Sequence, residues 1–164
     1  MAYIKNLDGN LKLEIKFLSN DMLNYNPQKS NYENWIPFTL GLFLPKRRNK
    51  IQEAAKATMT VYEIQEFLQK LEEALEQLNR QNHFSNSFCS SEAFFEIKLE
   101  TLPEDSVVEI EVWINVGNQT KGEIYGYDEG VRFVCGTKEL FEFIAQLKND
   151  FSDIINSVIS KTQK

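Results

Sequence analysis

The chain has 164 residues, of which 42% are hydrophobic and 26% charged, a composition typical of a soluble globular protein with a sizeable core. No linker or repeat divides it, so we predict a single domain over residues 1–164. The net charge of -6 argues against a nucleic-acid-binding protein that works by neutralising phosphates, and it suits a protein that attracts basic partners.

The first strand signal lies at residues 11–17, where apolar and polar side chains alternate with the period of a half-buried strand. The preceding Asp8-Gly9 pair suits a hairpin turn, because glycine accepts a positive φ. Residues 19–33 are polar and rich in turn formers, and we interpret them as a loop.

The apolar run at 35–45 predicts a second strand, with Phe38, Leu40 and Leu42 on one face. It contains a proline and is too short to cross a bilayer. We interpret the following residues 45–50, PKRRNK, as a basic turn, with contact to RNA or another anion as the alternative.

A helix is predicted to begin at Thr60, because Thr60 and Glu63 have the spacing of a capping box. Residues 51–59 lead into it either as a strand or as an irregular approach. One apolar stripe runs along the helix. Its opposite face carries Glu63, Glu66, Glu72, Glu73 and Glu76. This glutamate-rich side of the helix is either a solvated surface or a docking surface for a basic partner.

Later strands are predicted at 93–100 and 107–116, and a second long helix from about 138 to 160. In the segment 107–116, Glu109, Glu111 and Trp113 lie opposite the apolar face. Because strands come in consecutive groups, we expect an α+β fold: an antiparallel β-sheet with two long amphipathic helices packed on it. The strand order stays open.

The segment YGYDEGVRFVC at 125–135 begins with tyrosines and acids and continues as an apolar alternation. The apolar face switches sides near its start, and Gly126 and Gly130 suit a bulge or tight turn there. A bend would present aromatic and acidic side chains of the kind that interfaces use. The candidate partner-binding residues are Tyr125, Tyr127, Asp128 and Glu129, followed by Glu66, Glu73 and Glu76.

Catalytic and metal signals are weak. His83 is the one histidine, and a nucleophilic pair with Cys89, six residues away in a polar loop, has no third group to orient it. The cysteines, Cys89 and Cys135, form no metal-ligand or disulfide pattern. Adjacent carboxylates usually lie on solvated surfaces, and acid–base catalysis needs a cleft and a shifted pKa. We expect no enzyme, no cofactor and no metal.

Several segments fall in a familiar order: YENWIPFTLGL, TMTVYEIQEFLQKLEEAL, FFEIKLE, VEIEVWINV and GVRFVCGTKELFEFIAQLK. Over most of residues 3–150 the chain resembles the WapI-like immunity proteins, small bacterial proteins that protect a cell from the toxic C-terminal domain of wall-associated, contact-delivered toxins. The resemblance centres on Trp35, Thr60 and 130–133, and the chain departs from it in the loop 20–33 and the turn 45–50.

The resemblance implies that the protein inhibits a toxin by binding and has no catalytic residues of its own. The expected partner is the cognate toxin C-terminal domain, with no nucleic acid and no membrane. If the toxin is a nuclease, its basic substrate groove would suit an acidic inhibitor.

Two alternatives stay open: a scaffold domain of another system, and a small-ligand-binding domain or enzyme whose pocket uses some of the twelve phenylalanines. The N-terminus lacks the apolar core of a signal peptide, so we expect a cytoplasmic protein. We expect a monomer or a weak dimer, the dimer through a surface around Trp113.

Overall fold

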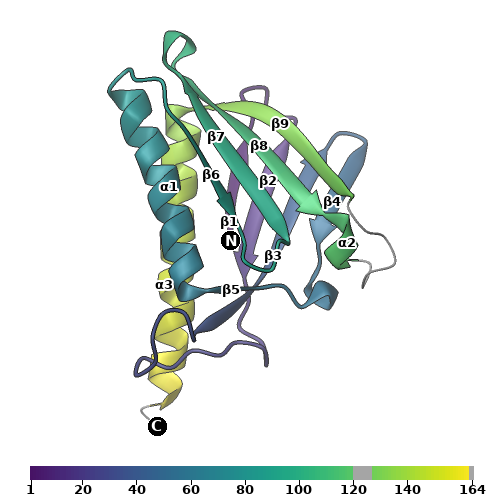
Figure 1. Cartoon of the computed structure of the whole chain (residues 1–164), viewed down its shortest axis with the longest axis vertical. Helices are drawn as coiled ribbons and strands as arrows, with labels where there is room; N and C mark the ends of the chain where they lie inside the picture. The colour runs from purple at the N-terminus through teal and green to yellow at the C-terminus, as the bar shows by residue number, and fades with distance from the viewer. Residues whose placement is uncertain (120–126, 163–164) are drawn as a thin grey trace.

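The computed structural model describes residues 1–119 and 127–162, which form two antiparallel β-sheets and two long helices (Figure 1). The prediction of one antiparallel sheet carrying both helices is wrong, although the α+β class holds. Residue alternation within a strand reports which side is buried, and it does not report how many sheets share the core.

The first sheet has the strand order β1-β2-β3-β4, with β5 paired to the start of β3. Its strands are β1 Ala2–Lys5, β2 Lys12–Phe17, β3 Trp35–Leu44, β4 Arg47–Ile51 and β5 Thr58–Thr60. The hairpin turn before β2 is confirmed, and Gly9 adopts φ +69 there. The predicted basic turn is wrong in part, because β4 begins at Arg47 and only Pro45 and Lys46 form the turn.

The second sheet has the order β6-β7-β8-β9. Its strands are β6 Ser85–Cys89, β7 Phe95–Leu102, β8 Val107–Asn115 and β9 Asp128–Gly136. Cys89 therefore ends a strand and does not lie in a loop. The β8–β9 register is unbroken along the whole of β9, without a bulge in this part of the described chain. The predicted bend, with Tyr125 and Gly126, lies outside the described residues.

The helices are α1 Val61–Asn79, the four-residue α2 Val116–Gln119 and α3 Thr137–Thr162, with short 3-10 turns at Glu53–Ala55 and Pro103–Asp105. The capping box at α1 is confirmed: the Glu63 amide donates to Thr60 Oγ1 at 3.1 Å, and the Glu63 carboxylate accepts from the Thr60 amide at 2.7 Å. Such a cap stabilises a helix by about 1 kcal/mol.

Glu63 also joins the helix to the second sheet, because its carboxylate accepts from the Ser91 amide at 2.6 Å. Burial disfavours the charged form of Glu63, but the hydrogen bonds from Ser91 and Thr60 outweigh burial and hold its pKa below the ordinary value. The charge thus stabilises the start of α1 at neutral pH.

The two long helices lie side by side, with α3 along β1 and α1 along β6 and β7 (Figure 1). Each helix therefore covers an edge of one sheet. The Tyr3 amide donates to Gln146 of α3 at 3.2 Å, and the Asn86 side chain donates to the Lys70 carbonyl of α1 at 3.1 Å. Among the helices of the described residues, none is long and apolar enough to cross a membrane.

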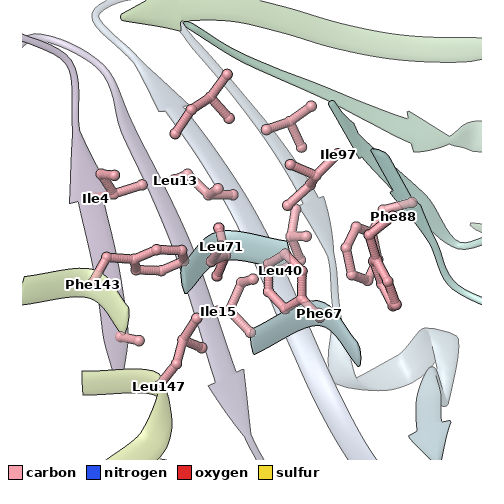
Figure 2. Packing of buried hydrophobic residues seen from close by; sticks show 14 of the residues in the cluster. Ile4, Leu13, Ile15, Leu40, Phe67, Leu71, Phe88, Ile97, Phe143 and Leu147 are labelled. Atoms are coloured by element: carbon pink, nitrogen blue, oxygen red, sulfur yellow. The ribbon is translucent and has the colours of Figure 1, made fainter. Parts of the chain in front are cut away.

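The core lies between the two sheets and the helices. Figure 2 shows side chains from all four parts meeting there, among them Leu40, Phe67, Ile97 and Phe143. Phenylalanine rings pack closely in this core, with centroids 5.0 Å apart for Phe67 and Phe88. These rings fill much of the interior.

Candidate partner-binding surface

The outer face of the second sheet is acidic. Alternation along β7 and β8 sends one set of residues into the core and the other outward, and the antiparallel register aligns the outward sets. We define the acidic face by its outward charged residues and one tryptophan. They are Glu96, Lys98, Glu100, Glu109, Glu111, Trp113, Asp128 and Arg132. This surface thus carries five carboxylates and two cations.

Trp113 lies near the C-terminal end of β8 on this face, and 38% of it is exposed. Its cross-strand partner is Gly130, where an added Cβ would lie 2.6 Å from Trp113 Cε3 and would also meet the Val112 carbonyl oxygen. The glycine therefore leaves the space in which the indole lies. Trp113 Nε1 donates to Glu111 Oε2 at 3.1 Å, which orients the ring.

Arg132 connects the acids on β8. Its guanidinium pairs with the Glu111 carboxylate, and its Nε lies 3.4 Å from Glu109 Oε1. The hydrogen bond from Trp113 and the charge of Arg132 lower the pKa of Glu111. The face thus presents an oriented aromatic ring within a fixed network of charges at neutral pH.

The strand β9 separates two of the predicted contact residues. Asp128 is exposed and lines a small hollow of about 90 Å³ on the acidic face together with Cys89 and Trp113. Glu129 has the opposite orientation, because it pairs in register with buried Ile114. Neighbours in the sequence therefore belong to different surfaces.

Glu129 points toward the first sheet, where its Oε1 lies 2.6 Å from the Arg47 guanidinium of β4. Tyr127, 48% exposed, donates its hydroxyl hydrogen to Glu129 Oε1 at 3.1 Å. Tyr125 lies outside the described residues. The three described members of the predicted group, Tyr127, Asp128 and Glu129, therefore lie at a corner between the two sheets and do not form one patch.

The acids of α1 lie elsewhere. Glu66 is 3.4 Å from Lys70, Glu76 pairs with Arg80, and Glu73 is half-buried. Because α1 runs beside β6 and Asp128 begins β9, the four-stranded sheet separates these acids from the corner at residues 127–129. The acidic face lies between the two predicted groups.

Sequence reasoning missed Glu96 and Glu100 of β7 as parts of one surface with Glu109 and Glu111. A signal for them existed: both segments alternate apolar residues with glutamates, and antiparallel pairing of the two would align the glutamates on one face. The sequence did not predict which strands pair, so it did not predict that these glutamates share one face.

The Cys–His nucleophile alternative does not match the geometry. His83 Nε2 lies 3.5 Å from Glu104, and strand β6, with a length of roughly 15 Å, lies between His83 and Cys89. Burial and nearby carboxylates raise the pKa of the Cys89 thiol, and burial raises that of Cys135 to about 12. Within the described residues, no group of three or more His, Cys, Asp or Glu could hold a metal ion.

The partly exposed tryptophan is a residue type in which protein–protein interfaces are enriched, and the carboxylates around it complement a basic partner. The chain belongs to the immunity protein WapI-like family, whose model matches residues 4–154, and the resemblance seen in the sequence is thereby confirmed. No curated protein matches the chain.

Among solved structures, the plant transcriptional regulator PBF-2 is similar over 99% of this chain and 86% of its own, at 8% identity and a TM-score of 0.47. WHY3 from Arabidopsis thaliana is similar over 95% of this chain and 93% of its own, at 12% identity. WHY1 from the same plant is similar over 94% of this chain and 92% of its own, at 11% identity, and both have a TM-score of 0.41.

Proposed function

We propose that this protein neutralises a cognate bacterial toxin domain by binding directly to it in the cytoplasm, without catalysis, and that the acidic face carries the contact. The observation that supports this most is the family membership together with a surface whose charges and aromatic ring are already in place. An inhibitor of this kind needs only to occlude the active surface of the toxin.

The proposed division of roles follows from exposure and charge. Trp113 is the anchor, because large aromatic side chains with fixed orientation dominate binding energy at interfaces. The surrounding carboxylates attract a basic partner and orient it during encounter. A nuclease is the toxin class whose basic substrate groove this face would fit.

The earlier candidates belong to this face or border it, and they stay part of the proposal. Tyr127 and Asp128 lie at its β9 corner, beside Tyr125 in the sequence, and Glu129 links that corner to the first sheet. Glu66, Glu73 and Glu76 lie beyond β6 and would contact the rim of a large partner.

Co-expression tests the proposal. The domain encoded immediately upstream is expressed with the wild type, with the double variant Glu100→Lys/Glu109→Lys, or with the matched control Glu142→Lys/Asp153→Lys on α3. Cell survival and co-purification are scored. We expect rescue and a one-to-one complex with the wild type and the control, and loss of both with the face variant.

Two results would contradict the proposal. Equal rescue by both double variants would exclude the acidic face, and absence of any rescue or complex would favour the scaffold alternative for that gene pair. Sedimentation of the free protein tests a further possibility, self-association. If the protein forms a stable dimer and Trp113→Ala dissociates it, the acidic face is a dimer interface.

A further inference from the structure

The outer face of the first sheet has the opposite charge. In register across the strands, Lys5, Lys12, Phe43 and Arg48 form one row, and Tyr3, Glu14, Gly41 and Lys50 form the next. We define the basic face as Lys5, Lys12, Lys16, Arg48 and Lys50 around Phe43. Glu14 is the one carboxylate in these rows, so a protein of net charge -6 gathers five cations on this sheet.

Phe43 is the aromatic residue of the basic face, and three of the five cations lie near its ring. Its ring lies over Gly41, where an added Cβ would be 2.7 Å from Phe43 Cε2. The Lys12 and Lys50 ammonium groups lie 4.4 and 4.9 Å from the ring centroid, and the Arg48 guanidinium lies 5.9 Å away. Cation–π attraction therefore holds three like charges close to one another.

Most of these cations lack a counter-charge. Lys12 lies 2.6 Å from Glu14. Within the part of the chain that the structure describes, Lys5, Lys16, Arg48 and Lys50 form no ion pair. Their mutual repulsion is relieved by an anionic partner, which gives the face a preference for one.

Strand β4 adds to this face an edge without a strand partner in the described chain, beside which β8 lies and at whose start Arg47 pairs with Glu129 of β9. It pairs with β3 on one side, and among the described residues no strand pairs with its other side. A groove of about 440 Å³ runs there, between Arg48 to Lys50 of β4 and Ile114, Val116 and Glu129. A second hollow, of about 370 Å³, lies on the outer face above Gly41 and also reaches Lys50.

We propose that β4 and the basic face accept an extended acidic segment of a partner protein, added to the first sheet as a further strand. Main-chain hydrogen bonds along a free edge provide affinity, and hollows on alternate sides of the strand accept alternate side chains. Acidic side chains of the segment would lie against Arg48 and Lys50.

Two physical arguments favour a polypeptide over a nucleic acid. Single-stranded nucleic acids bind by stacking bases on exposed aromatic rings, and the Phe43 ring is half-buried and already has cations close to it. The net charge of -6 also opposes a long polyanion more than a short acidic segment.

Basic residues on an edge strand have a second role, because they keep copies of a protein from pairing edge to edge. That role accounts for Arg48 and Lys50. It does not account for Lys12 and Lys16, which lie on β2 in the interior of the sheet.

The test uses the full chain and a fluorescent ten-residue peptide of alternating Glu and Val. Binding is followed by anisotropy at two salt concentrations and by NMR shifts of backbone amides. We expect binding that weakens with salt, shifts concentrated in β4, and at least a tenfold loss of affinity in Arg48→Glu/Lys50→Glu. The matched control Lys29→Glu/Lys138→Glu, with the same charge change elsewhere, should bind like the wild type.

Other outcomes overturn the proposal. Equal loss in the control variant would mean that only net charge matters. Equal binding of a Glu-Pro peptide, which lacks half the amide donors, would exclude strand addition. Tighter binding of oligothymidylate or of phosphatidylserine vesicles would assign another partner, and no binding at all would leave only edge protection.

This inference is independent of the proposed function, because no toxin takes part in the test. Trp113→Ala should lose toxin affinity and retain peptide binding. Each idea can therefore fail without the other.

Discussion

The outer faces of the two sheets share one local arrangement, an aromatic ring packed against a glycine, but they carry opposite charges. On the acidic face Trp113 lies against Gly130 within a network of glutamates, and on the basic face Phe43 lies over Gly41 among lysines and an arginine. In both, a glycine without a side chain lets an aromatic ring lie flat on the sheet. The glycine orients the aromatic ring, and the surrounding charges decide which partner each face favours.

The faces differ in how their charges are compensated. The acidic face contains its own cations, with Arg132 and Lys98 paired to glutamates. The basic face has one carboxylate, which pairs with Lys12. An internally paired surface keeps its geometry in the free protein, whereas an unpaired one gains most when an opposite charge arrives. The net charge of -6 therefore describes neither face.

The largest expected effect is a difference in stability between alanine variants of the two glycines. Gly130→Ala should lower the free energy of unfolding by about 2–3 kcal/mol, because the new methyl meets the Val112 backbone carbonyl, which cannot move without distorting the sheet. Gly41→Ala should cost about 1 kcal/mol or less, since its contact is with the Phe43 ring, which can turn away. Urea unfolding measures both, and equal costs would break the comparison.

A second prediction concerns toxin affinity. Trp113→Ala should weaken the toxin complex roughly thirtyfold, the effect of losing about 2 kcal/mol at an interface anchor. Phe43→Ala should leave that affinity unchanged, because its face is on the other sheet. Calorimetry on purified complexes measures the difference, and a larger loss in Phe43→Ala would exchange the roles of the two faces.

Residues 128 and 129 allow a finer test of the boundary. Asp128→Lys should slow toxin association about fivefold, because Asp128 belongs to the acidic face. Glu129→Lys should have less effect on association, and it should lower stability by at most about 1 kcal/mol through the loss of the partly exposed Arg47 pair. Stopped-flow rates and thermal melts separate the two, and equal association rates would contradict the division.

The smallest effect concerns the protonation of Glu111. Its pKa is lower in the folded protein than the ordinary value of 4.5, so its contribution to stability is present above that value and is lost as the pH falls through the folded pKa. The Tm difference between the wild type and Glu111→Gln should therefore be seen at pH 7 and vanish toward pH 3. A difference that persists at pH 3 would show that the charge of Glu111 does not hold the network.

Much of the local structure follows from short-range patterns in the chain. The capping box at Thr60 and Glu63, the turn at Asp8-Gly9 and the alternation at 107–116 all appear where they were predicted. Each depends mainly on groups within a few residues of one another, so that its signal is present in the local sequence.

The candidate surface was predictable only in part. The chain showed Trp113 with Glu109 and Glu111 on the outside of one strand, but it also grouped Asp128 with Glu129 and the acids of α1. Adjacency in a strand places neighbours on opposite faces, which is why Glu129 pairs with Arg47 and Asp128 does not. The α1 acids were plausible from charge alone, and only the position of α1 beside β6 separates them from the corner at 127–129.

Short-range patterns in the chain indicated the two long helices, the strands β2, β3, β7 and β8, and the membership in the WapI-like family, whereas β4 and β6 were predicted as turn and loop. Three features follow from the tertiary fold alone. The strands divide into two sheets, glutamates from β7 and β8 share one face, and lysines gather on the outer face of the other sheet with Phe43. The physical reason is range: periodicity reports a side chain's direction within its own strand, whereas strand pairing depends on packing between segments far apart in the chain.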